Sequence, residues 1–132
     1  MSRENVELVR RVVDPWGEGD FSAWIELFAE DVVLTAYMPE GVVPYDGRSA
    51  VLAYLAEFAS QWREYRVVVE NVASVSQDAV LVTGRQTGIG RGSGAEIAEP
   101  VSVVNVLRGE EIVSSHWHVD RKGALEAVGL AE

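Results

Sequence analysis

The densest group of side chains able to do chemistry lies near the end of the sequence, in the segment His116-Trp117-His118-Val119-Asp120. Alternate side chains of an extended strand point to the same face, so His116, His118 and Asp120 would share one face. A histidine beside a carboxylate can act as a general base, because the carboxylate orients the imidazole ring. We therefore predict that these three residues move protons in a catalytic site.

The same segment also has a structural interpretation, which stays open at this point. Asp is among the commonest residues at a helix N-cap, and the pattern predicts a short helix over residues 121–130 that Gly129 would end. Asp120 would then be a cap, and the two histidines would face solvent or an interface. A His-x-His pair can also bind a metal ion, but the chain has no cysteine and no third histidine to complete the site. We predict no metal.

The hairpin at Gly109-Glu110 decides which face of this strand meets the interior. A two-residue turn there would pair Leu107 with Ile112. The residues on their face would then be Asn105, Ser114, His116, His118 and Asp120. A three-residue turn would reverse every side chain of the strand and send Trp117 inward. Because two-residue turns are common, we expect a polar face toward the site, with Trp117 and Val119 left for a dimer interface.

Four further residues are candidates for substrate binding. Arg85 lies in a predicted strand and could clamp a carboxylate or an enolate, or it could be an exposed charge near a sheet edge. Asn105 lies in an apolar run, where a buried amide must find a partner, either a ligand or the protein itself. Tyr37 and Trp62 lie at the ends of predicted elements and could stack on a flat ligand, although core packing would also explain them.

The elements that position these residues follow from the period of the apolar positions. Helical spacing predicts a first helix that kinks or ends near Asp14 because of Pro15, and a second helix capped by Asp20 that buries Phe28. A third helix is expected over about 49–62. Strands are expected at 32–37 and at about 65–75, 79–90, 95–108 and 111–119, and a loop is expected to contain Pro39, Gly41, Pro44 and Gly47. Helices gathered on one face of a curved antiparallel sheet make an α+β fold.

Composition narrows the kind of protein. A length of 132 residues with 48% hydrophobic side chains fits one domain, residues 1–132. Eleven basic and 21 acidic side chains give a net charge of −10, which argues against binding nucleic acid or anionic membranes. The charged N-terminus is followed by no apolar signal core, and no apolar run reaches the roughly 20 residues that span a bilayer. We expect a cytoplasmic protein.

The order of elements and five sequence stretches resemble the SnoaL-like branch of the nuclear-transport-factor-2-like superfamily. The stretches are Gly19-Asp20 followed by Leu27-Phe28-Ala29-Glu30-Asp31, then Tyr45-Asp46-Gly47-Arg48, Trp62, Gly90-Arg91-Gly92-Ser93-Gly94, and Asp120-Arg121 leading into Ala124-Leu125-Glu126-Ala127-Val128-Gly129-Leu130. This resemblance implies a cone-shaped pocket between the concave face of the sheet and the helices. It also implies frequent dimerisation, but no single reaction.

The resemblance bears on function in two ways. In SnoaL-like cyclases an Asp that ends the last strand is the acid/base residue, and Asp120 occupies the matching place. The Tyr and the two Asp residues of ketosteroid isomerases fall near Val12, Ala36 and Val103 here, so steroid-type isomerisation is disfavoured.

Two functions therefore remain. The first is binding of a small apolar or polyketide-like molecule in the pocket, with cofactor-free acid/base catalysis of a cyclisation, isomerisation, dehydration or hydrolysis. The second is a non-catalytic ligand-binding or dimeric scaffold domain, which the missing isomerase residues favour. We expect a small-molecule ligand, a homodimer and no cofactor.

Overall fold

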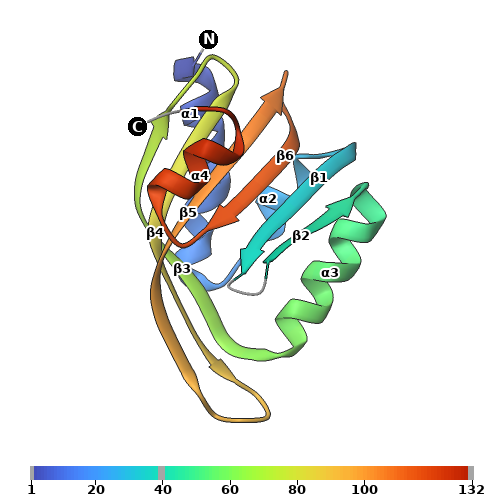
Figure 1. Ribbon diagram of the computed structural model, residues 1–132, viewed down its shortest axis with the longest axis vertical. Helices are drawn as coiled ribbons and strands as arrows, with labels where there is room; N and C mark the ends of the chain where they lie inside the picture. Colours follow the sequence, from blue (N-terminus) through green and yellow to red (C-terminus); the bar gives the residue numbers. More distant parts are fainter. Residues whose placement is uncertain (1, 39–40, 131–132) are drawn as a thin grey trace.

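The computed structural model describes residues 2–38 and 41–130, which form one strongly curved sheet with helices packed against it (Figure 1). The helices are α1 (Ser2–Val13), the 3-10 helix η1 (Asp14–Glu18), α2 (Ser22–Glu26), α3 (Arg48–Ser60) and α4 (Arg121–Ala127). The strands are β1 (Phe28–Met38), β2 (Gly41–Asp46), β3 (Trp62–Ser74), β4 (Ala79–Gly90), β5 (Glu96–Arg108) and β6 (Glu111–His118). None of the helices in the described ranges has both the length and the apolar character needed to cross a membrane.

The strands lie in the order β2-β1-β6-β5-β4-β3. Every neighbouring pair is antiparallel except β1 and β6, which run parallel. The α+β fold class is confirmed, and the sheet is mixed rather than wholly antiparallel. The parallel pair places β1, which follows the helical N-terminal segment, beside the last strand of the chain.

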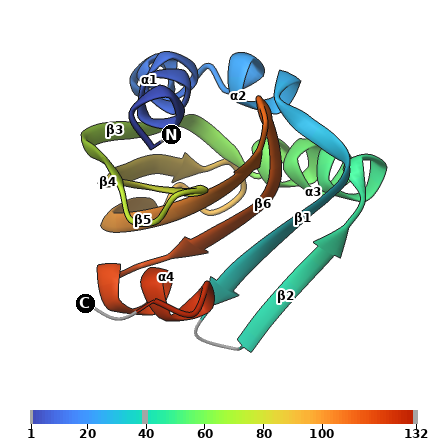
Figure 2. The same ribbon diagram turned by 90° about the horizontal axis from the view of Figure 1, so that it is seen from above.

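The helices cover both faces of the sheet, not one face as expected from the sequence (Figure 2). The first three helical segments and α3 lie against the concave face, where Trp16, Trp24 and Val103 are fully buried in the main core. The short helix α4 packs on the convex face, where its Ala124 joins Leu81 in a second, smaller cluster. The alternation of side chains along β4 and β5 supplies apolar residues to both clusters.

The N-terminal helices end where the sequence predicts a break. Pro15 lies in the first turn of η1, so α1 stops at Val13 and the chain continues as a 3-10 turn. Gly19 then closes this turn with a φ of 79°, and its N–H donates to the carbonyl oxygen of Trp16. Asp20 accepts hydrogen bonds from the backbone N–H and the hydroxyl of Ser22, at the start of α2.

Three boundaries differ from the sequence-based expectation. The segment expected to be a loop forms the edge strand β2, where Pro44 is tolerated because an edge position needs no second set of hydrogen bonds. The adjoining Pro39 lies outside the described residues. Phe28 begins β1 instead of ending a helix, and Trp62 begins β3 instead of ending α3. Single apolar residues at such junctions fit a helical stripe and a strand face equally well.

The strand β3 bends over β4 at a β-bulge. Glu70 is the extra residue, because Val69 pairs with Gly84 and Asn71 pairs with the preceding Thr83. A Cβ atom on Gly84 would overlap the carbonyl oxygen of Val68, so only glycine permits this close approach of the two strands.

We predict that Gly84→Ala destabilises the fold by about 1–3 kcal/mol, because the added methyl group must push the two backbones apart. Urea unfolding followed by circular dichroism measures the loss. Gly92→Ala is the matched control, since a Cβ atom there has no neighbour within 4 Å. Equal unfolding midpoints for the two variants would contradict the close packing of β3 on β4 at Gly84.

Candidate functional site

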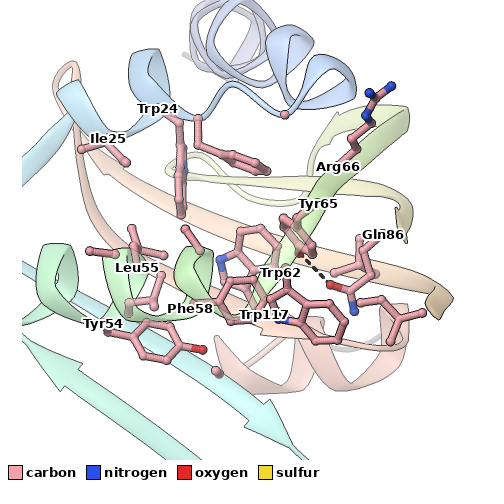
Figure 3. Close-up of a pocket in the computed structure, with 18 of the residues that line it drawn as sticks. Trp24, Ile25, Tyr54, Leu55, Phe58, Trp62, Tyr65, Arg66, Gln86 and Trp117 are labelled. Carbon is pink, nitrogen blue, oxygen red and sulfur yellow. Dashed lines mark hydrogen bonds between the residues drawn. The ribbon is translucent and has the colours of Figure 1, made fainter. Parts of the chain in front are cut away.

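A pocket of about 820 Å³ lies between the concave face of the sheet and the helices α2 and α3 (Figure 3). This volume is within the usual range for sites that enclose a small organic molecule. The apolar and aromatic lining comes from α2, α3 and the strands β1, β3, β5 and β6. It includes Phe21, Trp24, Ile25, Leu34, Ala36, Leu52, Tyr54, Leu55, Phe58, Trp62, Tyr65, Val101 and Trp117.

Two tryptophans form a rigid wall of the pocket. Trp24 packs edge-on against Trp117 at a centroid distance of 5.6 Å, and Trp117 stacks on the buried Trp16 at 5.3 Å. Edge-on and offset arrangements are the favoured geometries of aromatic rings. Because each ring is fixed by its neighbours, the wall is formed before any ligand arrives.

The polar edges of these two rings are bonded to the protein. The indole N–H of Trp24 donates to Asn105 Oδ1 at 3.2 Å, and that of Trp117 donates to Ser115 Oγ at 3.1 Å. Both acceptors are fully buried in the sheet. The wall therefore offers ring surface to a ligand, with its N–H groups already used. Asn105 lies behind Trp24, where it positions that ring, and it is not part of the lining.

One side of the pocket is polar. The hydroxyl of Tyr65 on β3 donates to Gln86 Oε1 on β4 at 2.7 Å, and Gln86 Nε2 donates to Glu99 Oε1 on β5 at 2.7 Å. Burial raises the pKa of the Tyr65 hydroxyl well above its ordinary value, and the nearby Tyr54 and Glu99 raise it further. Tyr65 is therefore neutral at physiological pH.

A second β-bulge turns Tyr65 toward the pocket. Arg63 pairs with Ile89 and Arg66 with Thr87, so Glu64 and Tyr65 together face the single residue Gly88. Glu64 takes a left-handed φ of 53° to accommodate this. A Cβ atom on Gly88 would press on the rings of Tyr65 and Trp62, at 3.3 and 3.4 Å, so glycine makes room for both rings.

Of the predicted histidine face, His116 and Asp120 do not line this pocket, and a third bulge is the reason. The two-residue turn is confirmed, because Arg108 pairs with Glu111 and Leu107 with Ile112. Val106 then pairs with Ser114, which leaves Val113 as an extra residue. This one-residue shift reverses the rest of the strand. The expectation that Asn105 shares a face with the histidines is therefore wrong, as is the expectation that Trp117 is left for an interface.

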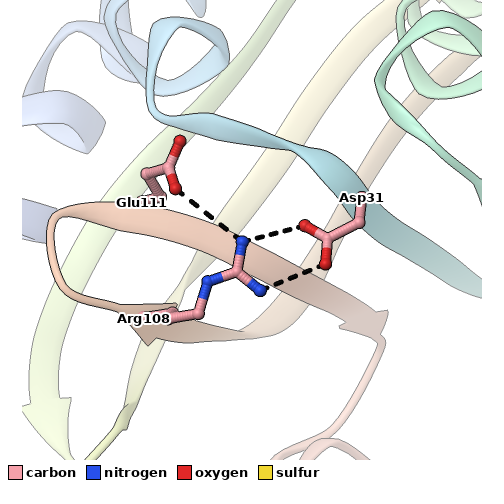
Figure 4. Close-up of polar contacts among 3 residues, drawn as sticks. All are labelled: Asp31, Arg108 and Glu111. Atoms are coloured by element: carbon pink, nitrogen blue, oxygen red, sulfur yellow. Dashed lines mark hydrogen bonds and ion pairs between the residues drawn. The ribbon is translucent and has the colours of Figure 1, made fainter.

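Arg108 joins this hairpin to β1 (Figure 4). Its guanidinium makes two hydrogen bonds to the Asp31 carboxylate, at 3.0 and 3.1 Å, and lies 3.8 Å from Glu111. The Arg108 guanidinium lowers the pKa of the Asp31 carboxyl below its ordinary value. All three side chains are exposed, so the contribution of these ion pairs to the free energy of unfolding is small.

The three predicted proton-transfer residues lie on or beside the convex face, near α4. Asp120 caps α4, since its Oδ1 accepts a hydrogen bond from the Gly123 N–H at 2.6 Å. The His118 ring stacks on Tyr37 at a centroid distance of 3.6 Å, and both residues border the pocket only at the ends of their strands. His116 Nε2 lies 3.2 Å from Ser114 Oγ on the same outer face. No group of three or more His, Asp or Glu side chains is arranged to bind a metal within residues 2–38 and 41–130.

The other two predicted binding residues, Trp62 and Arg85, differ in their position relative to the pocket. Trp62 lines the pocket where α3 meets β3. Arg85 is exposed and outside the pocket lining, with a long contact of 3.4 Å from Nη2 to the Ala98 carbonyl oxygen. Sequence reasoning singled out Arg85 for its charge and passed over its neighbour Gln86. The cross-strand pair of Gln86 and Glu99 could have been found from the hairpin that joins β4 and β5.

We predict that His116 makes the protein less stable in acid. Burial lowers the pKa of His116 below its ordinary value of about 6.5, so the unfolded chain takes up a proton there before the folded chain does. The free energy of unfolding is unaffected by His116 above about pH 6.5, and it falls as the pH drops toward the lowered pKa. His116→Gln removes this proton uptake, so its urea midpoint should fall less between about pH 7.5 and pH 5.5 than that of the wild type. The same loss in both proteins would exclude His116 as the cause.

Solved structures with this fold include three instructive neighbours. A proposed SnoaL-like polyketide cyclase from Jannaschia sp. CCS1 has a TM-score of 0.75 and 24% identity, over 96% of this chain and 90% of that one. A hypothetical protein with a ketosteroid isomerase-like fold from Catenulispora acidiphila DSM 44928, in complex with trimethylamine, has a TM-score of 0.72 and 22% identity, over 94% and 93%. TerC, co-crystallised with polyporic acid, has a TM-score of 0.68 and 15% identity, over 88% and 91%.

The sequence itself identifies the family. No curated protein matches this chain. The model of the SnoaL-like domain matches residues 9–115, a range that runs from within α1 to within β6 and includes the residues that line the pocket except Trp117, His118 and Val119. The chain therefore belongs to the SnoaL-like domain family.

Proposed function

We propose that this SnoaL-like protein binds a flat, largely apolar ring compound, of the polyketide-like kind, in the concave pocket. The observation that carries the proposal is the preformed wall of Trp24 and Trp117, whose N–H groups are bonded behind the lining. Such a wall offers ring surface for stacking and no unsatisfied donor to a ligand. Phe58 and Trp62 extend the aromatic surface along α3 and β3.

The neighbouring structures support the same class of ligand. TerC was crystallised with the organic acid polyporic acid, and the Jannaschia protein carries the name of a polyketide cyclase. Each is less than 25% identical to this chain, so what they contribute is a precedent for small molecules in this fold.

Binding, rather than proton transfer by the histidine segment, is the function that the geometry supports best. His116 and Asp120 are not among the lining residues, and His118, which is among them, has its ring stacked on Tyr37. A general base must lie within hydrogen-bond reach of the proton that it removes. The proposal accordingly assigns no catalytic step to these three residues and requires no cofactor.

The proposal predicts that His116→Gln and Asp120→Asn leave ligand affinity unchanged.

A pocket-filling variant tests the proposed site. We expect Ala36→Leu to weaken binding of the neutral aromatic dye N-phenyl-1-naphthylamine by about 10-fold or more, because the larger side chain occupies space beside Trp117. The measurement is the rise in dye fluorescence during titration with protein.

The matched control is Ala98→Leu, the same change at an exposed position of β5 outside the pocket lining. This variant should bind the dye as the wild type does, and circular dichroism should show that both variants fold. Equal dye affinity in Ala36→Leu and Ala98→Leu would mean that the dye binds elsewhere, and the proposed site would then be rejected.

The proposal keeps the homodimer and the cytoplasmic setting that the sequence predicts. The family resemblance and an exposed Val68 on β3 support self-association. Native mass spectrometry is expected to give twice the chain mass of 14.4 kDa. A monomer at micromolar concentration would refute the dimer and leave the ligand proposal intact.

A further inference from the structure

On the polar side of the pocket, Glu99 fixes which group donates and which accepts in each hydrogen bond. An ionised carboxylate can only accept hydrogen bonds. The group of Gln86 that faces Glu99 at 2.7 Å must therefore be the donating Nε2, which turns Oε1 toward Tyr65. Because Oε1 can only accept, the Tyr65 hydroxyl must donate to it. The orientation of each group in the series follows from the charge at its outer end.

The consequence for the pocket lies at the Tyr65 oxygen. Its one proton is committed to Gln86, so only its lone pairs remain for a ligand. Bonds in a series polarise one another, which makes this oxygen a better acceptor than an isolated phenol. The ring of Tyr65 stacks on Phe21 at 5.8 Å and meets Phe58 edge-on at 5.0 Å, so the oxygen is held in place.

We propose that the Tyr65–Gln86–Glu99 series selects ligands that present a hydrogen-bond donor, such as a phenolic or enolic hydroxyl, to the Tyr65 oxygen. The inference rests on the proposed function, because it names the polar group of the ring compound that the pocket binds. Glu99 and Gln86 are positioning residues, since they act on the ligand through Tyr65. The charges around the pocket agree with this selection, because the lining carries Glu18, Glu64 and Glu99 against the single cation Arg66 within the described residues.

Two ligands of nearly the same shape test the selection. 2-Naphthol offers a donor hydroxyl, and 2-methoxynaphthalene offers only an acceptor at the same position. Each is used to displace N-phenyl-1-naphthylamine from the pocket. In the wild type we expect 2-naphthol to bind about 3- to 10-fold more tightly, the effect of one neutral hydrogen bond. Tyr65→Phe should abolish this preference while still binding both compounds.

The Glu99→Gln variant tests whether the carboxylate is needed to fix the direction of these hydrogen bonds. A glutamine at position 99 can donate or accept, so Gln86 is free to turn over and Tyr65 is free to donate to the ligand. The preference for 2-naphthol should then shrink toward equality. Glu96→Gln removes the same charge from an exposed neighbour on β5 outside this hydrogen-bonded series, and it should keep the wild-type preference.

The outcomes distinguish the two proposals. If neither naphthalene displaces the dye from the wild type, the proposed function fails. If both displace it with equal affinity, or if Glu99→Gln and Glu96→Gln retain the same preference, the pocket binds ring compounds but the selection of a donor is refuted.

Discussion

Val113 has no partner on β5, and this one extra residue decides which side chains of β6 reach the pocket. Beyond the bulge, Ser115 and Trp117 face inward while Ser114 and His116 face outward. The inward ring completes the stack with Trp16 and the edge contact with Trp24. Without the bulge the histidines would occupy this space, and the wall of the pocket would be polar and ionisable. The apolar character of the site is therefore a consequence of strand register rather than of composition alone.

Three of the bulges in this sheet serve the pocket. The bulge at Glu64 and Tyr65 aims a phenol inward, and the one at Glu70 bends β3 over Gly84. Bulges increase the twist of a strand locally, and the accumulated curvature gives the concave face on which α2 and α3 close. The glycines opposite them, Gly84 and Gly88, leave room for the displaced backbone and rings. Gly84 and Gly88 thus have a geometrical role in the sheet.

The sequence was enough to predict the elements other than β2, and the two-residue turn, because these depend on local signals such as Pro15, Asp120 and the apolar period. It was not enough to predict the site. No local signal distinguishes Val113 in a bulge from Val113 in a regular strand, yet that difference reverses the face of His116. The parallel pairing of β1 with β6 and the edge strand β2 are set by contacts between distant segments. The sequence did not single out Tyr65 either, because its hydrogen-bonded series uses Gln86 on β4 and Glu99 on β5, which are distant from it along the chain.

On the convex side, polar residues that the strand register turns outward pack against or cap the helix α4. His118 fits between Tyr37 and the first turn of α4, where Gly123 leaves room for the imidazole ring. Asp120 fixes that turn by its cap hydrogen bond. Burial lowers the pKa of both histidines below the ordinary value. A cluster with the composition of a catalytic site can therefore serve as the packing surface of a helix. Composition and proximity along the chain identify groups capable of chemistry, but only the face they occupy relative to a cavity decides whether a substrate can reach them.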